Sequence, residues 1–188
     1  MQATDSPSIN SNTNTPHYSL VATMLHWTVA ICFLLALGLG IAKGYIPKDS
    51  RGSLMFLHKS LGLSVLFLMV IRVLWRFTHK PPSYPESMAS WEKKFANSNH
   101  ILLYILALLI PMSGLTMSSA HNHASSFWGL FAIQLPIHSK TIGGFAKSFH
   151  YYAAWVVGSL LLLHIFAIIK HQYIDKDNIL ARMLRFKK

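Results

Sequence analysis

Acidic residues and cysteine are scarce in this chain. Only 6 of its 188 residues are Asp or Glu, charged residues of both signs amount to 12%, and there is 1 cysteine. A soluble domain carries about twice that charged fraction, so a water-facing globular fold is disfavoured. The single Cys32 excludes an internal disulfide framework and any cysteine-rich zinc or iron–sulfur site. Because Cys32 lies within an apolar run, we expect a small buried hydrophobic residue there.

Long apolar runs dominate what is present, since 52% of the residues are hydrophobic. Four runs, at about 20–42, 54–77, 98–119 and 148–170, are each long enough to cross ~30 Å of hydrocarbon at ~1.5 Å per residue. In lipid the backbone must satisfy its own hydrogen bonds, which predicts a helix for every run. The predicted fold class is therefore all-α, an integral membrane four-helix transmembrane bundle. Residues 17–188 form this domain, and the Ser/Thr/Asn-rich residues 1–16 are predicted to be a disordered polar tail.

The basic excess follows the membrane pattern. The formal charge is +11, from 17 Lys and Arg, and these residues lie mostly between the apolar runs rather than in one dense patch. This distribution disfavours a nucleic-acid partner and favours charges that flank membrane spans. An even number of spans places both termini on one side. That side carries eleven of the basic residues and the other side six, which predicts that both termini are cytoplasmic.

Histidines inside the apolar runs are the candidate functional residues, because ionisable groups in a membrane are costly and usually serve a function. The last run contains His150 and His164. They are 14 residues apart, which in a helix separates them by about 21 Å and leaves them within roughly 40° of one face. One helix therefore offers an imidazole near each side of the membrane.

Each of these imidazoles has a candidate partner at its own depth. His26, near the cytoplasmic start of the first run, matches His164, and His58, at the outer start of the second run, matches His150. Two imidazoles on opposite faces of a porphyrin are the ligands of a six-coordinate haem, which fits between helices. No carboxylate or cysteine accompanies them, which disfavours zinc and di-iron sites. The pattern predicts two haem b groups, with His26, His58, His150 and His164 as axial iron ligands.

Several residues near these pairs have open roles. His100, at the start of the third run, is either a hydrogen-bond neighbour of the inner haem or a replacement for His26 or His164. Arg72 follows His58 by 14 residues and either pairs with a haem propionate or extends to the headgroups. Gly62, Gly114 and Gly158 either make room for a porphyrin or serve helix–helix contact. The motif His121-x-His123 can bind a metal, but a solvated loop is the expected role.

An ordered set of short motifs carries a family resemblance over residues 17–186. The motifs are Tyr18 with Leu25-His26-Trp27; Leu57-His58 with Gly62 and Arg72-x-x-x-Arg76; His100 to Tyr104 with Pro111-x-x-Gly114; Lys147-x-x-His150; His164; and Lys176-Asp177-Asn178-x-Leu180-x-Arg182-Met183. Together they resemble the bacterial cytochrome b561 proteins, which are related to the cytochrome b subunits of nickel hydrogenases. The resemblance implies an inner-membrane diheme electron carrier with the same four histidines as ligands. An activity described in that family is oxidation of superoxide at the periplasmic face with reduction of ubiquinone.

Three functions follow as hypotheses. The leading one is electron transfer across the membrane between a periplasmic donor and ubiquinone. The outer face carries six basic residues and one acid, Asp49, so that a small anion such as superoxide would be attracted, although ordinary loop charge gives the same pattern. The second hypothesis is a haem-bearing membrane anchor that passes electrons from a hydrogenase or dehydrogenase subunit to quinone. The third is a haem-free transporter.

Overall fold

Four long helices make up most of the computed structural model, which describes residues 17–177 and 179–184. They are α1 (Leu20–Ala42), α2 (Arg51–Thr78), α3 (Ser90–Ala120) and α4 (Lys140–Lys170). Each coincides with a stretch long and apolar enough to cross a membrane, so the predicted all-α transmembrane bundle is confirmed. The predicted polar tail, residues 1–16, lies outside the described residues.

The helices exceed the apolar runs at several ends. α3 begins at Ser90 rather than near residue 98, and α4 begins at Lys140 rather than near 148. Hydropathy detects only the part of a helix that suits lipid, whereas the backbone hydrogen-bond ladder continues into water wherever the residues allow a helix. The Ser139 hydroxyl accepts the amide hydrogen of Ile142 and so caps the start of α4 in this polar extension.

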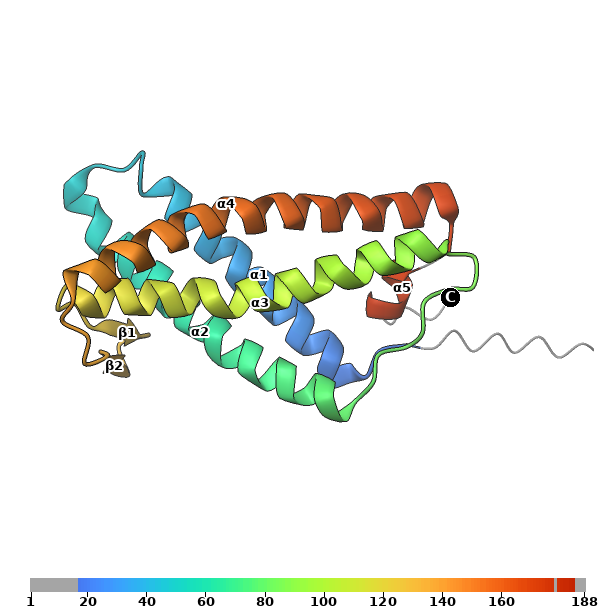
Figure 1. The fold of residues 1–188 in the computed structure, drawn as a ribbon, viewed down its shortest axis with the longest axis horizontal. Helices are drawn as coiled ribbons and strands as arrows, with labels where there is room; N and C mark the ends of the chain where they lie inside the picture. Colours follow the sequence, from blue (N-terminus) through green and yellow to red (C-terminus); the bar gives the residue numbers. More distant parts are fainter. Residues whose placement is uncertain (1–16, 178, 185–188) are drawn as a thin grey trace, which may run out of the picture.

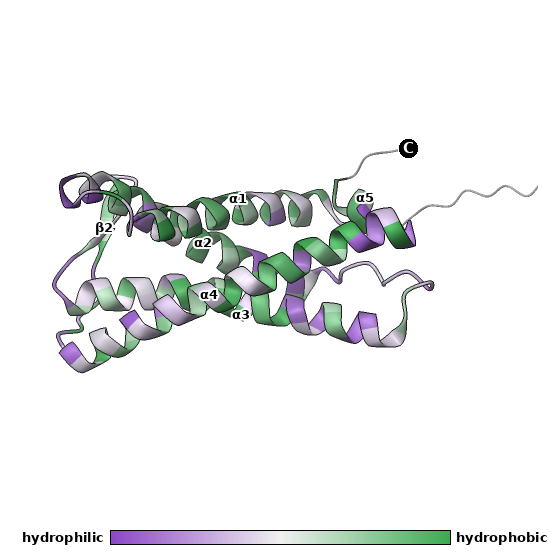
Figure 2. Ribbon diagram, turned by 90° about the horizontal axis from the view of Figure 1, so that it is seen from above, coloured by the Kyte–Doolittle hydropathy of each residue, from purple (hydrophilic) through white to green (hydrophobic). Residues whose placement is uncertain are grey.

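The bundle consists of two helical hairpins. α1 packs along α2, α3 packs along α4, and α2 with α3 joins the two hairpins. The start of α1 and the end of α4 lie at one end of the bundle, here named the terminal end (Figure 1). The opposite end, here named the hairpin end, carries a short antiparallel β-hairpin. Hydrophobic residues dominate the length of the four helices (Figure 2).

Packing inside the bundle is modest, and large apolar side chains also face outward. One buried cluster joins Val29, Val65, Met69 and Ala107 across three helices, and a second joins residues of α3 and α4. Outside, Phe77 is 82% exposed, and many other large apolar side chains of the four helices are exposed with it. An apolar exterior on this scale is the surface of a protein dissolved in lipid rather than in water.

The β-hairpin belongs to the connection between α3 and α4. Strands β1 (Ser125–Phe127) and β2 (Phe131–Ile133) pair antiparallel, with Ser125 opposite Ile133. Ser60 of α2 is fully buried beneath it; its hydroxyl donates to the carbonyl of Ser126 and accepts the amide hydrogen of Trp128, both at 3.1 Å. The hairpin is therefore fixed to α2 two residues beyond His58.

The remaining elements are short. A 3₁₀ turn (Lys48–Ser50) leads into α2, and a π-helical turn (His171–Asp175) extends α4. The helix α5 (Ile179–Leu184) then returns to the terminal end. There the carbonyl of Arg182 accepts the amide hydrogen of Tyr18, and the carbonyl of Met183 accepts the indole hydrogen of Trp27. α5 thereby closes the terminal end against the start of α1.

Candidate functional site: two histidine pairs

The structure brings four of the intramembrane histidines together as two pairs. At the hairpin end the ring centres of His58 on α2 and His150 on α4 are 6.1 Å apart. At the terminal end the ring centres of His26 on α1 and His164 on α4 are 6.4 Å apart. α4 contributes to both pairs, with its two histidines about 21 Å apart along the helix. These are the pairs that the depth argument groups together.

The spacing of each pair suits one metal ion between the rings. An imidazole nitrogen lies about 2 Å from a metal ion that it binds, so rings on opposite sides of one ion have centres roughly 6 Å apart. The ring planes are inclined by 76° at the hairpin end and by 61° at the terminal end, which keeps the rings from stacking on each other. Both pairs therefore have the separation that a haem iron with two axial imidazoles requires.

The hairpin-end pair is also in the required tautomer. Nδ1 of His58 lies 2.8 Å from the carbonyl oxygen of Ala36, and Nδ1 of His150 lies 2.8 Å from that of Ile110. Because a carbonyl oxygen can only accept, Nδ1 carries the proton in each ring and Nε2 keeps its lone pair. Metal-ligating histidines usually have such a partner, which fixes the ring and raises its basicity.

Two glycines make these backbone contacts possible. Gly40 lies four residues after Ala36, and Gly114 lies four residues after Ile110. A Cβ at Gly40 would come within 3.2 Å of the His58 ring, and one at Gly114 within 3.1 Å of the His150 ring. Glycine therefore lets each imidazole approach the backbone of the neighbouring helix. Sequence reasoning missed Gly40 and assigned Gly114 to porphyrin space or helix contact. The available signal was the presence of a glycine within each apolar run.

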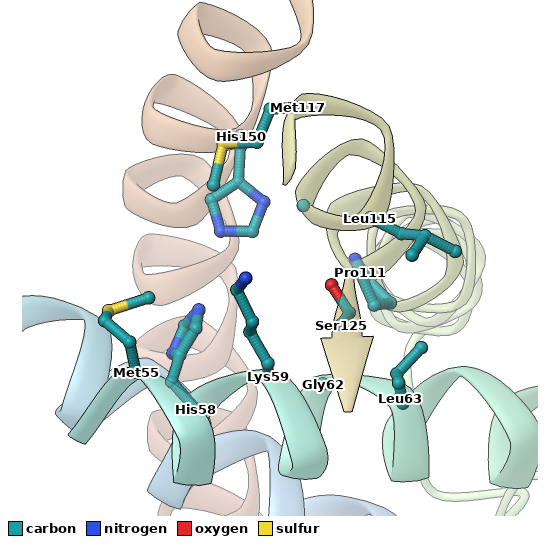
Figure 3. A pocket seen from close by; sticks show the side chains of 11 residues that line it. Met55, His58, Lys59, Gly62, Leu63, Pro111, Leu115, Met117, Ser125 and His150 are labelled. Carbon is teal, nitrogen blue, oxygen red and sulfur yellow. The ribbon is translucent and has the colours of Figure 1, made fainter. Parts of the chain in front are cut away.

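A cavity lies between the members of the hairpin-end pair (Figure 3). It is lined by both histidines together with Met55, Lys59, Gly62, Leu63, Pro111, Gly114, Leu115, Met117 and Ser125. The Lys59 ammonium points into this space and donates to the Ser118 hydroxyl at 2.7 Å. The cavity has a volume of about 50 Å³ and is partly open to the outside of the bundle. Much of its wall consists of the flexible side chains of Lys59, Met55 and Met117, which are the groups that a planar ligand would displace.

The terminal-end pair has different surroundings. Arg72 lies at this pair, with its Nη2 2.9 Å from Nδ1 of His26, and its Nε donates to the Tyr104 hydroxyl at 2.8 Å. A guanidinium can only donate, so Nδ1 of His26 accepts here and Nε2 carries the ring proton. Metal binding through Nε2 of His26 therefore requires Arg72 to leave Nδ1, and a carboxylate such as a haem propionate is a suitable new partner for it.

His100 joins the same cluster from α3. Its ring centre lies 5.3 Å from that of His164. An open cavity of about 400 Å³ between α2 and α3 borders His100; the other lining residues are Val73, Arg76, Phe77, Ile101, Tyr104, Ile105 and Leu108. Its lining is mainly apolar, with one guanidinium, one imidazole and one phenol. Such a cleft suits a flat apolar ligand with a few polar atoms.

The side chains of Tyr18, just before α1, and of Tyr84, in the loop between α2 and α3, are half-buried. Burial raises the pKa of the Tyr18 phenol, and the positive charge of Arg76 opposes this shift. Burial raises the pKa of the Tyr84 phenol in the loop between α2 and α3 in the same way. Both groups stay protonated at neutral pH and are available as hydrogen-bond donors at the edge of the terminal-end cluster.

The other residues singled out from the sequence lie apart from the pairs. His121, which follows the last residue of α3, is exposed and bonds the carbonyl of Met117, and His123 is exposed in the adjoining loop. Among the described residues these two are part of no grouping of three metal-ligating side chains. A Cβ at Gly62 or at Gly158 would meet no atom within 4 Å, so the backbone has free space beside it at both positions.

A four-span apolar bundle with imidazoles paired at two depths is the architecture of a membrane b-type cytochrome. The chain belongs to the prokaryotic cytochrome b561 family, whose model matches residues 17–186. It is 34% identical to cytochrome b561 homolog 2 of Escherichia coli (strain K12) over 183 residues, which cover 93% of this chain and 95% of that protein. It is 30% identical to cytochrome b562 of Cereibacter sphaeroides, over 92% of this chain and 98% of the relative.

A third relative carries a name that states an activity. The chain is 24% identical to the probable superoxide oxidase CybB of Yersinia pestis, over 91% of this chain and 97% of that protein. Membership of the family establishes a membrane cytochrome that binds haem b and takes part in electron transfer. The haem-free transporter hypothesis is thereby disfavoured.

Proposed function

We propose that this protein is a diheme electron carrier that oxidises superoxide at one face of the bacterial inner membrane and reduces ubiquinone within it. His58 and His150 would hold one haem b, and His26 and His164 the other. The observation that carries this assignment is the spacing of the two pairs, 6.1 and 6.4 Å between ring centres. Held by two imidazoles, each iron would supply one-electron redox chemistry with no open position for oxygen to bind.

The proposed orientation places the terminal end in the cytoplasm and the hairpin end in the periplasm. Its support is the charge asymmetry, eleven basic residues on the side of the termini against six on the other. The two histidine pairs then lie near opposite faces. Electrons that enter at the hairpin end would leave near the cytoplasmic face.

Lys59 supports superoxide as the electron donor. Its ammonium forms part of the wall of the cavity that both hairpin-end histidines line. A positive charge on this flexible side chain, beside the electron entry point, raises the local concentration of a small anion. In the overall reaction, each superoxide would lose one electron and leave as dioxygen. Two electrons and two protons would convert one quinone to quinol.

The cleft between α2 and α3 supports quinone as the acceptor. Its lining is mainly apolar, and it borders the terminal-end histidine cluster through His100. Arg76 and Tyr104 contribute hydrogen-bond donors there. A quinone ring with carbonyl oxygens and an apolar tail has the chemistry that such a cleft accommodates.

Stopped-flow mixing of the purified protein with superoxide tests the proposal. Haem reduction in the wild type is expected to be fast and to slow with added salt, because the attraction is electrostatic. Lys59→Gln should slow the reaction and reduce its salt dependence, whereas Lys140→Gln, which changes an exposed lysine at the hairpin end, should leave the rate near that of the wild type. Haem reduction in His58→Ala that is as fast as in the wild type would contradict the proposal.

A haem-bearing anchor for another enzyme is the second candidate, because the matching family model also bears the name of a nickel-hydrogenase cytochrome b. Purification from native membranes separates the two functions. Stable co-purification with a large soluble oxidoreductase, together with slow haem reduction by superoxide, would support the anchor. An isolated chain that reacts rapidly with superoxide and quinone would support the carrier.

Gly114→Ala tests whether the backbone contact of His150 holds the hairpin-end haem. The new Cβ would come 3.1 Å from the His150 ring, so the ring must shift and its bond to the Ile110 carbonyl must weaken. Loss of such a partner typically costs 10–100-fold in metal affinity, so we expect about tenfold faster haem loss to a soluble haem-binding protein. Gly144→Ala is the control, because Gly144 is exposed on α4 and a Cβ there would meet no atom within 4 Å. Equal rates of haem loss in both variants would show that the contact does not matter.

A further inference from the structure

A compact group of charged side chains lies at the end of α4, apart from the two histidine pairs. The π-helical turn places Asp175 on the same side as His171, and Lys176, in the left-handed region at φ 56°, turns the chain so that Asp177 also returns to His171. Nδ1 of His171 lies 2.9 Å from Oδ2 of Asp175 and 2.8 Å from Oδ2 of Asp177. The sequence alone assigned no role to His171.

An ion pair between His171 and one aspartate does not explain why both carboxylates lie at the same ring nitrogen. One ring nitrogen carries at most one hydrogen, yet two carboxylate oxygens converge on Nδ1 of His171. Lys170 neutralises only part of the charge, because its ammonium lies between Oδ2 of Asp175 at 2.6 Å and Glu92 at 2.7 Å. Lys170 forms no ion pair with Asp177 in the described part of the chain.

Asp177 gives an independent indication of a missing partner. Its side chain is only 6% exposed, and that of His171 is 8% exposed. Oδ1 of Asp177 is buried and has no hydrogen-bond partner among the described residues. A buried carboxylate oxygen without a partner is costly, since the charge is neither hydrated nor fully neutralised. A cation bound at this carboxylate would supply the partner.

We propose that His171, Asp175 and Asp177 bind one divalent transition-metal ion of the zinc type. The three donor atoms, one imidazole nitrogen and two carboxylate oxygens, lie within 4.8 Å of one another. Mixed nitrogen and oxygen donors suit Zn²⁺ and its first-row neighbours better than Mg²⁺ or Ca²⁺, which prefer oxygen alone. Two positive charges balance the two aspartates, while Lys170 and Glu92 form a neutral pair.

The ion would fix the conformation of the turn that connects α4 to α5. α5 follows Asp177 closely, and its Arg182 donates to the carbonyl of Ser83 at 2.7 Å while the carbonyl of Met183 accepts from Trp27. Through these contacts α5 packs at the terminal end, next to the terminal-end pair of histidines. An ion that binds only the folded arrangement stabilises it by mass action, so occupancy would hold this closure in place.

Zinc binding to the full-length, haem-loaded protein tests the proposal. After equilibrium dialysis at micromolar free Zn²⁺ and removal of loose metal, elemental analysis should find one zinc per wild-type chain. Asp177→Asn should bind zinc at least about tenfold more weakly, with an unchanged haem spectrum that reports an intact bundle. Asp49→Asn, an exposed acid at the hairpin end, and His123→Ala should bind as the wild type does.

Two further measurements keep the proposal falsifiable if Asp177→Asn does not fold. Asp175→Asn, which changes the more exposed ligand, should also weaken zinc binding. Added Zn²⁺ should raise the Tm of the wild type, and a chelator should reverse the rise. Less than stoichiometric zinc in the wild type, or equal binding in the aspartate variants and in the wild type, would overturn the proposal.

Discussion

Replacement of His150 by alanine is expected to halve the haem content of the purified protein, from the proposed two haems per chain to one. His150 and His58 face each other across 6.1 Å, and each is held by a backbone carbonyl that leaves its Nε2 free. With one imidazole removed, an iron at this depth keeps a single strong protein ligand. The terminal-end pair lies about 21 Å farther along α4 and should keep its haem.

Haem and protein assays on the same sample give the ratio directly, and low-temperature absorption shows which α band is lost. His138→Ala is the matched control, because His138 is exposed at the hairpin end and, among the described residues, bonds only the side chain of Asn122. It should retain both haems. Two haems in His150→Ala would exclude His150 as a ligand, and none would show that the two sites do not load independently.

The sequence predicts the helices and the depth of each histidine because both depend on local quantities. Hydropathy locates a membrane span, and a fixed rise per residue sets the distance between His150 and His164. The grouping of His58 with His150 follows from the same rise together with the alternating direction of the spans. Nothing in that reasoning requires knowledge of how the helices pack.

What the sequence does not predict depends on packing between helices. The carbonyls of Ala36 and Ile110 act as imidazole partners only because Gly40 and Gly114 let another helix approach. The β-hairpin depends on the buried Ser60, whose role appears only when α2 lies beneath the loop. Its three-residue strands are too short to give an alternating pattern that could be recognised.

The contact of Arg72 with His26 illustrates the same limit at the other pair. Helical spacing places Arg72 at the depth of the terminal-end cluster, but it does not choose between a propionate, a headgroup and an imidazole. In the structure the guanidinium lies between Nδ1 of His26 and the hydroxyl of Tyr104. This position keeps the arginine next to the proposed haem, and it makes the identity of the terminal-end ligands a question for experiment.

His26→Ala and His100→Ala should separate the two candidate ligands that face His164. The ring centres of His26 and His164 are 6.4 Å apart, close to the roughly 6 Å that one ion between two rings requires. The separation between His100 and His164 is 5.3 Å, which is short for that arrangement. We therefore expect His26→Ala to lose the terminal-end haem and His100→Ala to retain both haems.

The retained haem in His100→Ala should still change in its properties. His100 borders the cleft proposed for quinone and lies against the ring of His164, so its loss should shift the potential of the terminal-end haem and slow quinone reduction. Haem counting with redox titration of each variant measures both effects. Retention of two haems by His26→Ala, together with loss of one by His100→Ala, would reverse the assignment and make His100 the partner of His164. In that case Arg72 could remain on Nδ1 of His26, because His26 would no longer have to release its Nε2 proton to bind iron.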